Sequence, residues 1–346
     1  MRVMGVGLRL LVIVLACAPA LAARVLGVEA LGVTVRDLDR SIAYYRDVLA
    51  FELMKIEEDE GETLEHVTGV FAAHTRTATM RLGSETIELT QFLAPEGRSV
   101  PETWRSCDQW FQHIAIVVRD MDEAYEALRR ASVRHASPSP QTLPEWNRSA
   151  GGIRAFYFKD PDGHALEIIW FPDGKGHPRW REPTERLFLG IDHTAIVVRD
   201  TERSLEFYRD MLGLRVVGES RNHGPEQERL NSVLGASLRI TALRAAHGPG
   251  VELLEYIEPR DCEPFPSDLA ANDLAHWQIV VSVDEVTEAA EDVVLGGGRR
   301  VSAAVTASVR EGRAGVLFRD PDGHAVLALQ ASEGLPQTRN RGDIVR

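Results

Sequence analysis

Four short segments along the chain share one pattern of hydrophobic and polar positions. Each is an aliphatic, largely β-branched run that ends at an aspartate, which is typical of a buried β-strand. Their sequences are VEALGVTVRD (28–37), FQHIAIVVRD (111–120), IDHTAIVVRD (191–200) and AHWQIVVSVD (275–284). Four copies of one element indicate an internally repeated architecture.

A helical pattern follows each of these strands. The four segments are LDRSIAYYRDVLA, MDEAYEALRRA, TERSLEFYRDMLG and EVTEAAEDVVLGG. Asp37, Asp120 and Asp200 stand at the junctions, where an aspartate caps the first turn, and Gly213 suits the end of the third helix. Further strands divided by glycine-containing turns follow, so we expect a strand, a helix and about three strands per unit.

The units end in two alternating styles. The second and fourth close with FKDPDGHALEIIW and FRDPDGHAVLALQ, where Asp-Pro-Asp-Gly predicts a tight turn. The first and third close with TIELTQFLAP and VELLEYIEP. We expect His164 and His324, which follow the turns, to be exposed. Proline-rich and charged linkers separate the units near 94–109, 171–187 and 259–274.

Composition narrows the classes of partner. The chain has 346 residues, enough for two ordinary domains, and its apolar and charged fractions, 44% and 26%, are those of a globular protein. The formal net charge is −13, and no basic stripe could collect phosphates. We therefore expect neither a nucleic acid nor an anionic membrane as a partner.

The N-terminus differs in kind from the rest of the chain. Two arginines precede the apolar run LLVIVLACAPALA, which is too short to span a bilayer and ends in a small-residue site. We interpret residues 1–22 as a cleaved secretory signal. This predicts a periplasmic or secreted protein with no membrane span after cleavage; lipoprotein anchoring at Cys17 is the alternative.

Export changes how the remaining cysteines are interpreted. After cleavage Cys107 and Cys262 remain, and both lie between the repeated units. An even pair in an oxidising compartment permits a disulfide. Two unrelated small buried thiols are the other interpretation.

The repeated unit resembles the vicinal oxygen chelate superfamily, on the motifs FYRDMLG and DPDGHALE. This group includes glyoxalase I, extradiol dioxygenases, methylmalonyl-CoA epimerase, and the fosfomycin and bleomycin resistance proteins. The resemblance implies an α+β fold in which four βαβββ modules pair into two cupped, barrel-like domains. We expect the modules at 23–96, 110–172, 188–258 and 275–332, followed by a disordered tail at 333–346.

The resemblance also implies a divalent metal inside a cup, held by one residue from the first strand and one from the last strand of each unit. The first-strand positions hold Ala30, His113, His193 and His276. The last-strand positions hold Glu88, Glu167, Glu252 and Leu327. A single strand histidine is usually an ordinary core or surface residue. A glutamate inside an apolar strand, as in ALEIIW, needs a cation or a donor, because burying an unpaired carboxylate is costly.

The pairing of the units decides which of these residues meet. Pairing in chain order would leave two incomplete sites, Glu88, His113 and Glu167 in one domain and His193, Glu252 and His276 in the other. Pairing of the middle units would join the complete glyoxalase-like set, His113, Glu167, His193 and Glu252, and leave a degenerate second site. We prefer the second arrangement. The linkers carrying the two cysteines then both cross between the domains, which makes a disulfide sensible.

The resemblance and this ligand set predict a metal-dependent isomerase, epimerase or lyase of the glyoxalase type. Two imidazoles and two carboxylates suit Zn, Ni, Co, Mn or Fe. Such an ion chelates two neighbouring substrate oxygens and stabilises an enediolate, with Glu167 or Glu252 as the base. The expected substrate is a small vicinal-oxygen molecule. A glutathione adduct is not expected, because an exported protein meets little glutathione.

Two other functions stay open. An Fe(II) extradiol-type dioxygenase would use His193, His276 and Glu252, although the family's extradiol enzymes take their glutamate from the final strand, where this chain has Leu327. A non-catalytic small-molecule binding protein would resemble the resistance proteins. One chain already carries four units, so we expect a monomer or a homodimer.

Overall fold

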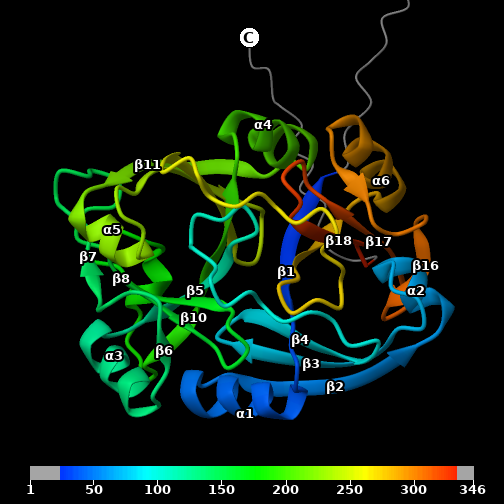
Figure 1. Cartoon of the computed structure of the whole chain (residues 1–346), viewed down its shortest axis with the longest axis horizontal. Coiled ribbons are helices and arrows are strands. Elements are labelled where there is room, and N and C mark those ends of the chain that lie inside the picture. Colours follow the sequence, from blue (N-terminus) through cyan, green and yellow to red (C-terminus); the bar gives the residue numbers. More distant parts are fainter. Residues whose placement is uncertain (1–23, 333–346) are drawn as a thin grey trace, which may run out of the picture.

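The structure, a computed structural model, describes residues 24–332. The expected signal, residues 1–22, and the expected tail, residues 333–346, lie outside the described residues. Two nine-stranded sheets lie side by side (Figure 1). We call them the middle cup, built from the second and third units, and the terminal cup, built from the first and fourth.

The middle cup has the strand order β11-β12-β13-β10-β5-β9-β8-β6, and β7 also pairs with β8. Its strands are β5 (Gln112–Val118), β6 (Arg134–His135), β7 (Gln141–Thr142), β8 (Arg154–Lys159), β9 (Ala165–Trp170), β10 (Phe188–Val198), β11 (Arg215–His223), β12 (Ser237–Arg244) and β13 (Gly250–Glu258). The two repeated strands β5 and β10 are antiparallel neighbours at its centre.

The terminal cup has the order β15-β17-β18-β14-β1-β4-β3-β2, and β16 also pairs with β17. Its strands are β1 (Val25–Thr34), β2 (Glu52–Glu60), β3 (His74–Leu82), β4 (Glu85–Ala94), β14 (Trp277–Val283), β15 (Arg299–Arg300), β16 (Thr306–Arg310), β17 (Arg313–Arg319) and β18 (Ala325–Gln330). The preferred pairing of the units is therefore confirmed, and pairing in chain order is wrong. Both sheets stay open rather than closing into barrels.

The helices begin where the sequence predicts. The side chains of Asp37, Asp120 and Asp200 each accept a hydrogen bond from a backbone N–H in the first turn, and Gly213 has φ 75° just beyond the third helix. The helices are α1 (Leu38–Leu49), α2 (Glu62–Thr68), α3 (Met121–Arg130), the 3₁₀ turn η1 (Pro178–Arg181), α4 (Thr201–Leu205), its π-helical continuation η2 (Glu206–Met211), α5 (Pro225–Asn231) and α6 (Val286–Leu295). The short α2 and α5 were not predicted.

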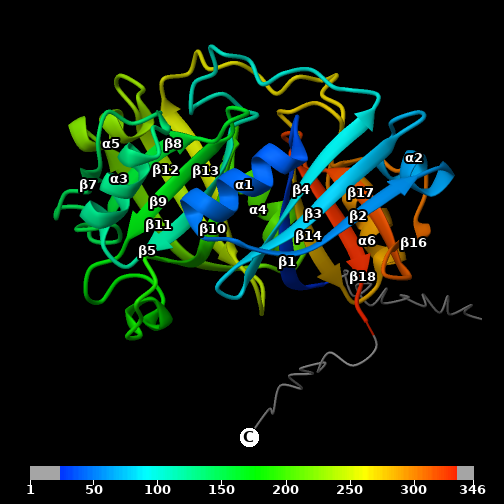
Figure 2. The ribbon, with the colours of Figure 1, turned by 90° about the horizontal axis from the view of Figure 1, so that it is seen from below.

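One hydrophobic core runs through both cups, with members in β1, β5, β9, β14 and the long helices. Helix α1 lies at the junction of the cups (Figure 2). The hydroxyl of Tyr45 donates to Asp160 across this junction, and the hydroxyl of Tyr208 donates to Asp320. The two tyrosines occupy equivalent positions in the first and third units, and the two aspartates occupy equivalent positions in the second and fourth units. The two cups are therefore related by an approximate twofold axis.

The histidines of the Asp-Pro-Asp-Gly turns are buried, which corrects the expectation that they are exposed. Only 2% of His164 and 3% of His324 is accessible to solvent. His164 lies 2.8 Å from Asp160 through Nδ1 and 2.6 Å from the carbonyl of Leu274 through Nε2. Nε2 of His324 lies 2.7 Å from the carbonyl of Val197. The turns are buried because each inserts against the neighbouring cup.

A disulfide joins Cys107 to Cys262. The two linkers also exchange hydrogen bonds, from the backbone of Glu263 to Asp108 and from the backbone of Gln109 to Glu263. Both linkers run from one cup to the other, so the disulfide covalently joins the two connecting segments. Between residues 24 and 332, no helix combines the length and apolar character that crossing a bilayer requires.

Candidate metal centre

Strand register brings four predicted ligands to one face of the middle cup. Ala115 in β5 pairs with Glu167 in β9, and Ala195 in β10 pairs with Glu252 in β13. The antiparallel pairing of β5 and β10 sets His193 against Ala115 and His113 against Ala195. Because side chains alternate along a strand, all four ligand positions share the concave face.

The four side chains converge closely. Nε2 of His113 lies 3.1 Å from Oε2 of Glu167, and Nε2 of His193 lies 3.7 Å from the same oxygen. Nε2 of His193 also lies 3.4 Å from Oε2 of Glu252. Donors bound to one divalent ion at about 2.0–2.2 Å are about 3.0–3.5 Å apart, so two of these distances match such an ion and the third, 3.7 Å, is slightly longer. His113, Glu167 and His193 are buried and form a group that could hold a metal.

Asp192 fixes the orientation of His193. Its Oδ2 lies 3.0 Å from Nδ1 of His193 and accepts a hydrogen bond from Arg244, while its Oδ1 accepts one from the indole of Trp180. A carboxylate only accepts, so Nδ1 of His193 carries the proton and Nε2 faces the other ligands. Asp192, Arg244 and Trp180 are residues of this candidate site that the sequence interpretation missed.

The local charge is negative. Burial alone lowers the pKa of His193, but Glu252 and Asp192 outweigh burial and raise it to about 9. Burial, together with nearby Asp192 and Glu167, raises the pKa of Glu252. Buried carboxylates in this number favour a cation among them.

His113 is held differently from His193. Its ring packs 4.8 Å from the ring of Tyr157 and 5.5 Å from that of Phe111, measured between centroids. Its Nδ1 has no hydrogen-bond partner among the described residues. Aromatic packing therefore orients this imidazole, and the preceding residue, Gln112, donates to Thr194 instead.

A pocket of about 120 Å³ opens onto the four ligands. Among the residues that the structure describes, no lysine or arginine lines it. Leu143, Ala150 and Ile153, from the segment between β7 and β8, form part of its wall. The side chain of Asn147 donates to Asn222, which pins that segment over the cup.

The terminal cup lacks an equivalent ligand set. By register, Gln278 stands where the middle cup has His113, because Gln278 pairs with Ala325 as His113 pairs with Ala165. The alternative ligand His276 therefore lies two residues before the ligand position, which corrects the expectation that it occupies the first-strand position of the fourth unit. The N-cap position of the helix of the fourth unit is Glu285 rather than Asp284, although its side chain makes no capping hydrogen bond, and this shift by one residue explains part of the offset.

The other alternative ligand, Glu88, occupies its expected position but pairs with a side-chain cation. Its Oε1 lies 2.5 Å from Nη1 of Arg310. The remaining ligand positions hold the apolar residues Ala30 and Leu327. Glu29, at the position equivalent to Asp192, pairs with Arg313.

The dioxygenase triad predicted as an alternative is not assembled. His276 precedes β14 of the terminal cup and lines the pocket there, whereas His193 and Glu252 line the pocket of the middle cup. Burial and the nearby Arg319 lower the pKa of His276 to about 3.

Comparisons with known proteins agree with this architecture. A 2-epi-5-epi-valiolone epimerase of an Actinomyces species is 33% identical over 145 residues, 41% of this chain and 77% of that protein. A lactoylglutathione lyase of Arabidopsis thaliana is 22% identical over 306 residues, 88% of this chain and 91% of that protein. A lactoylglutathione lyase of Haemophilus influenzae is 28% identical over 145 residues, 41% of this chain and 93% of that protein.

The fold is also that of solved structures. Glyoxalase I from Zea mays superimposes with a TM-score of 0.57 at 18% identity, covering 89% of this chain and 92% of that chain. The sequence profile of the Glyoxalase/Bleomycin resistance protein/Dioxygenase superfamily matches residues 27–168 and 190–327. These two matches take up most of the chain, one in each half, and the chain therefore belongs to this superfamily.

Proposed function

We propose that the chain is a metal-dependent isomerase, epimerase or lyase that acts on a small vicinal-oxygen substrate in the middle cup. The observation that carries this proposal is that Glu167 lies 3.1 and 3.7 Å from the imidazoles of His113 and His193, and that Glu252 lies 3.4 Å from His193. Relatives named as an epimerase and as lactoylglutathione lyases support the same class of chemistry.

His113, Glu167, His193 and Glu252 would hold the ion, which we expect to be Zn, Ni, Co, Mn or Fe. When bound, a divalent ion supplies Lewis acidity to two neighbouring oxygens of the substrate and so acidifies the adjacent C–H bond. Asp192 keeps Nε2 of His193 available for this role.

Glu252 is the better placed of the two glutamates to move a proton. Its side chain is 23% exposed to the pocket, against 6% for Glu167. Glu167 is also within hydrogen-bonding distance of His113, at 3.1 Å, whereas Glu252 lies 3.4 Å from His193. Glu252 would take a proton from the carbon beside a substrate carbonyl. In an isomerisation it would return that proton to the neighbouring carbon, while the proton of the substrate hydroxyl passes to the former carbonyl oxygen. In an epimerisation a second group, for which Glu167 is the candidate, would deliver a proton to the opposite face of the same carbon.

The pocket favours a compact substrate without negative charge. Its volume is about 120 Å³, and no lysine or arginine among the described residues lines it. A glutathione adduct carries carboxylates that would meet Glu167 and Glu252, and no lysine or arginine among the described residues lines the pocket to bind them. We therefore assign an uncharged α-hydroxycarbonyl or dicarbonyl molecule as the substrate class.

Two measurements test this proposal. Elemental analysis should find about one divalent ion per chain in wild type and in His276→Ala, and none in His113→Ala. In D₂O, the metal-loaded protein should catalyse deuterium incorporation beside the carbonyl of acetoin or dihydroxyacetone, observed by NMR. Loss of metal in His276→Ala alone would contradict the proposed centre. A metal-free wild type would favour the non-catalytic binding protein.

We also propose that the protein is exported. The Cys107–Cys262 cystine supports this, because disulfides persist mainly in oxidising compartments. N-terminal sequencing of the protein from its host should then begin at Ala23. A first residue at Cys17 carrying lipid would identify a lipoprotein, and a retained Met1 in the cytosolic fraction would contradict export.

A further inference from the structure

The terminal cup contains a pocket larger than the one at the candidate metal centre. Its volume is about 340 Å³, against 120 Å³ in the middle cup. Strands β1 to β4 form its concave wall, and α2, β16, β17 and β18 contribute the remaining sides. This volume lies within the range of about 300–1,000 Å³ that is typical of small-molecule sites.

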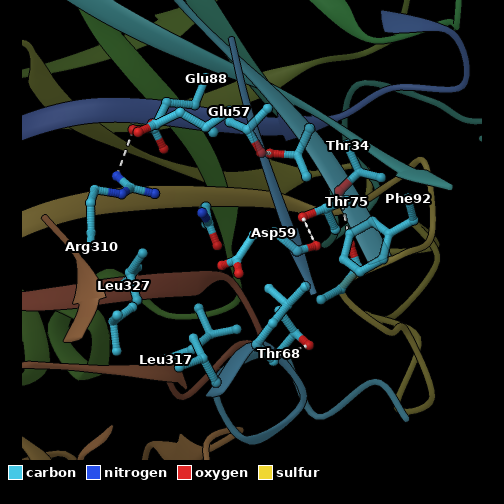
Figure 3. A pocket seen from close by; sticks show the side chains of 18 of the residues that line it. Thr34, Glu57, Asp59, Thr68, Thr75, Glu88, Phe92, Arg310, Leu317 and Leu327 are labelled. Atoms are coloured by element: carbon cyan, nitrogen blue, oxygen red, sulfur yellow. Dashed lines mark hydrogen bonds and ion pairs between the residues drawn. The ribbon is translucent and has the colours of Figure 1, made fainter. Parts of the chain in front are cut away.

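One oxygen of a buried carboxylate at one end of the pocket lacks a hydrogen-bond partner among the described residues. Glu88 is 6% exposed, and Arg310 pairs with its Oε1 only. Its Oε2 has no hydrogen-bond partner among the described residues. An unpaired buried oxygen is unfavourable, so this end of the pocket requires a donor. Figure 3 shows Glu88 and Arg310 at one end and Thr75 and Phe92 at the other.

The charges around the pocket disfavour an anionic occupant. Five carboxylates line it, against two cationic side chains, Lys55 and Arg310. Both cations are already paired, Lys55 with Glu57 and Glu311, and Arg310 with Glu88. A ligand carrying carboxylate or phosphate would meet excess negative charge, whereas a neutral or amine-bearing ligand would not.

The remaining lining suits a ligand with several hydroxyl groups. Seven threonines line the pocket, each able to donate and to accept a hydrogen bond. Phe92, Leu317 and Leu327 supply apolar surface. A hydroxylated ring has the same combination, with hydroxyl groups around its edge and C–H groups on its faces.

We propose that the terminal cup is a second, metal-free site that binds a hydroxyl-rich small molecule without negative charge, of the sugar, cyclitol or amino-sugar class. We assign no metal to this site because, of the four positions equivalent to the ligands of the middle cup, only Glu88 has a metal-binding side chain of the predicted type. That carboxylate already pairs with Arg310. The site is separate from the middle cup and does not depend on the function proposed there.

Saturation-transfer NMR and calorimetry on the full chain with its metal test this site. The probes are myo-inositol and D-glucosamine, with D-glucuronate as the anionic probe of similar size. We expect both uncharged or cationic probes to bind, and glucuronate to bind at least tenfold more weakly.

Variants locate the bound probe. Leu317→Trp fills the terminal pocket and should abolish binding, and Thr79→Val, which removes one hydroxyl without changing shape, should weaken it several-fold. Leu254→Trp makes the matched change in the middle pocket and should leave probe affinity unchanged. The proposal is overturned if neither myo-inositol nor glucosamine binds, or if Leu254→Trp abolishes binding while Leu317→Trp and Thr79→Val do not.

Discussion

The carboxylate of Asp192 lies 3.0 Å from Nδ1 of His193, although the two residues are neighbours in one strand. Side chains of neighbouring strand residues normally point to opposite faces. The pairing of β10 with β5 shifts register between Ile191 and His193, and such an irregularity re-aims side chains. The second unit has Gln112 before its histidine, so this carboxylate–imidazole pair serves one ligand of the proposed centre.

We predict that Asp192→Asn weakens metal binding about 10–100-fold, because the imidazole of His193 loses the carboxylate that fixes its tautomer. Competition with a chromophoric chelator measures the affinity. Gln112→Ala is the control, since Gln112 precedes the other histidine but contacts Thr194 instead. Equal losses in the two variants would show that Asp192 does not act through His193.

The two glutamates of the centre should respond differently to replacement by glutamine. Glu252→Gln, assayed at saturating metal, should slow deuterium incorporation into the substrate about 10²–10⁴-fold, because the proton acceptor is lost. Glu167→Gln should lose the metal itself, since both imidazoles lie within 3.7 Å of this carboxylate. Glu258→Gln, at the exposed end of the same strand as Glu252, should change neither property. Undiminished exchange in Glu252→Gln would remove this residue from the proton transfer.

Much of the fold could be predicted because short stretches of sequence determine the strands and the helix caps. The four apolar strands and the aspartate caps follow from hydrophobic pattern and capping chemistry, whereas the pairing of the middle units was inferred from the ligand positions that the family resemblance implies. Asp37, Asp120 and Asp200 cap their helices as predicted. The disulfide was left open by the sequence, because a bond between residues 155 positions apart depends on which linkers meet.

Other features depend on tertiary contacts that no local pattern contains. His164 and His324 follow tight turns, which are normally exposed, and become buried where the two cups pack together. His276 was aligned by its distance from Asp284, but strand register places Gln278 at the ligand position. Arg244 could not be connected to Asp192, because the two residues belong to different strands.

The disulfide should contribute measurably to stability. It closes a loop between residues 155 positions apart, and we expect the double variant Cys107→Ser/Cys262→Ser to lose about 2–5 kcal/mol of unfolding free energy. Urea unfolding followed by circular dichroism measures this loss. Reduction of wild type with dithiothreitol should reproduce it, and should leave the variant unchanged. An unchanged urea midpoint after reduction would contradict the expected contribution.

His164 makes the stability depend on pH. Burial alone would lower its pKa, but Asp160 outweighs burial and raises it, and both ring nitrogens face acceptors. Burial alone would raise the pKa of Asp160, but His164 and backbone hydrogen bonds lower it. The histidine's contribution is complete below its ordinary pKa of 6.5 and is lost as pH rises through the raised value. The aspartate's contribution is complete above 3.8 and is lost as pH falls through the lowered value.

We therefore predict that His164→Asn lowers the unfolding free energy most between about pH 4 and 6.5, by about 3–5 kcal/mol, and by progressively less as the pH rises through the raised pKa of the wild-type imidazole. Urea unfolding of wild type and variant at pH 5.5 and pH 9 measures the difference. His74→Asn is the control, because the His74–Glu58 pair is largely solvent-exposed and should contribute at most about 1 kcal/mol. A loss in His164→Asn that is the same at both pH values would mean that packing, rather than the charged pair with Asp160, accounts for the contribution of this side chain.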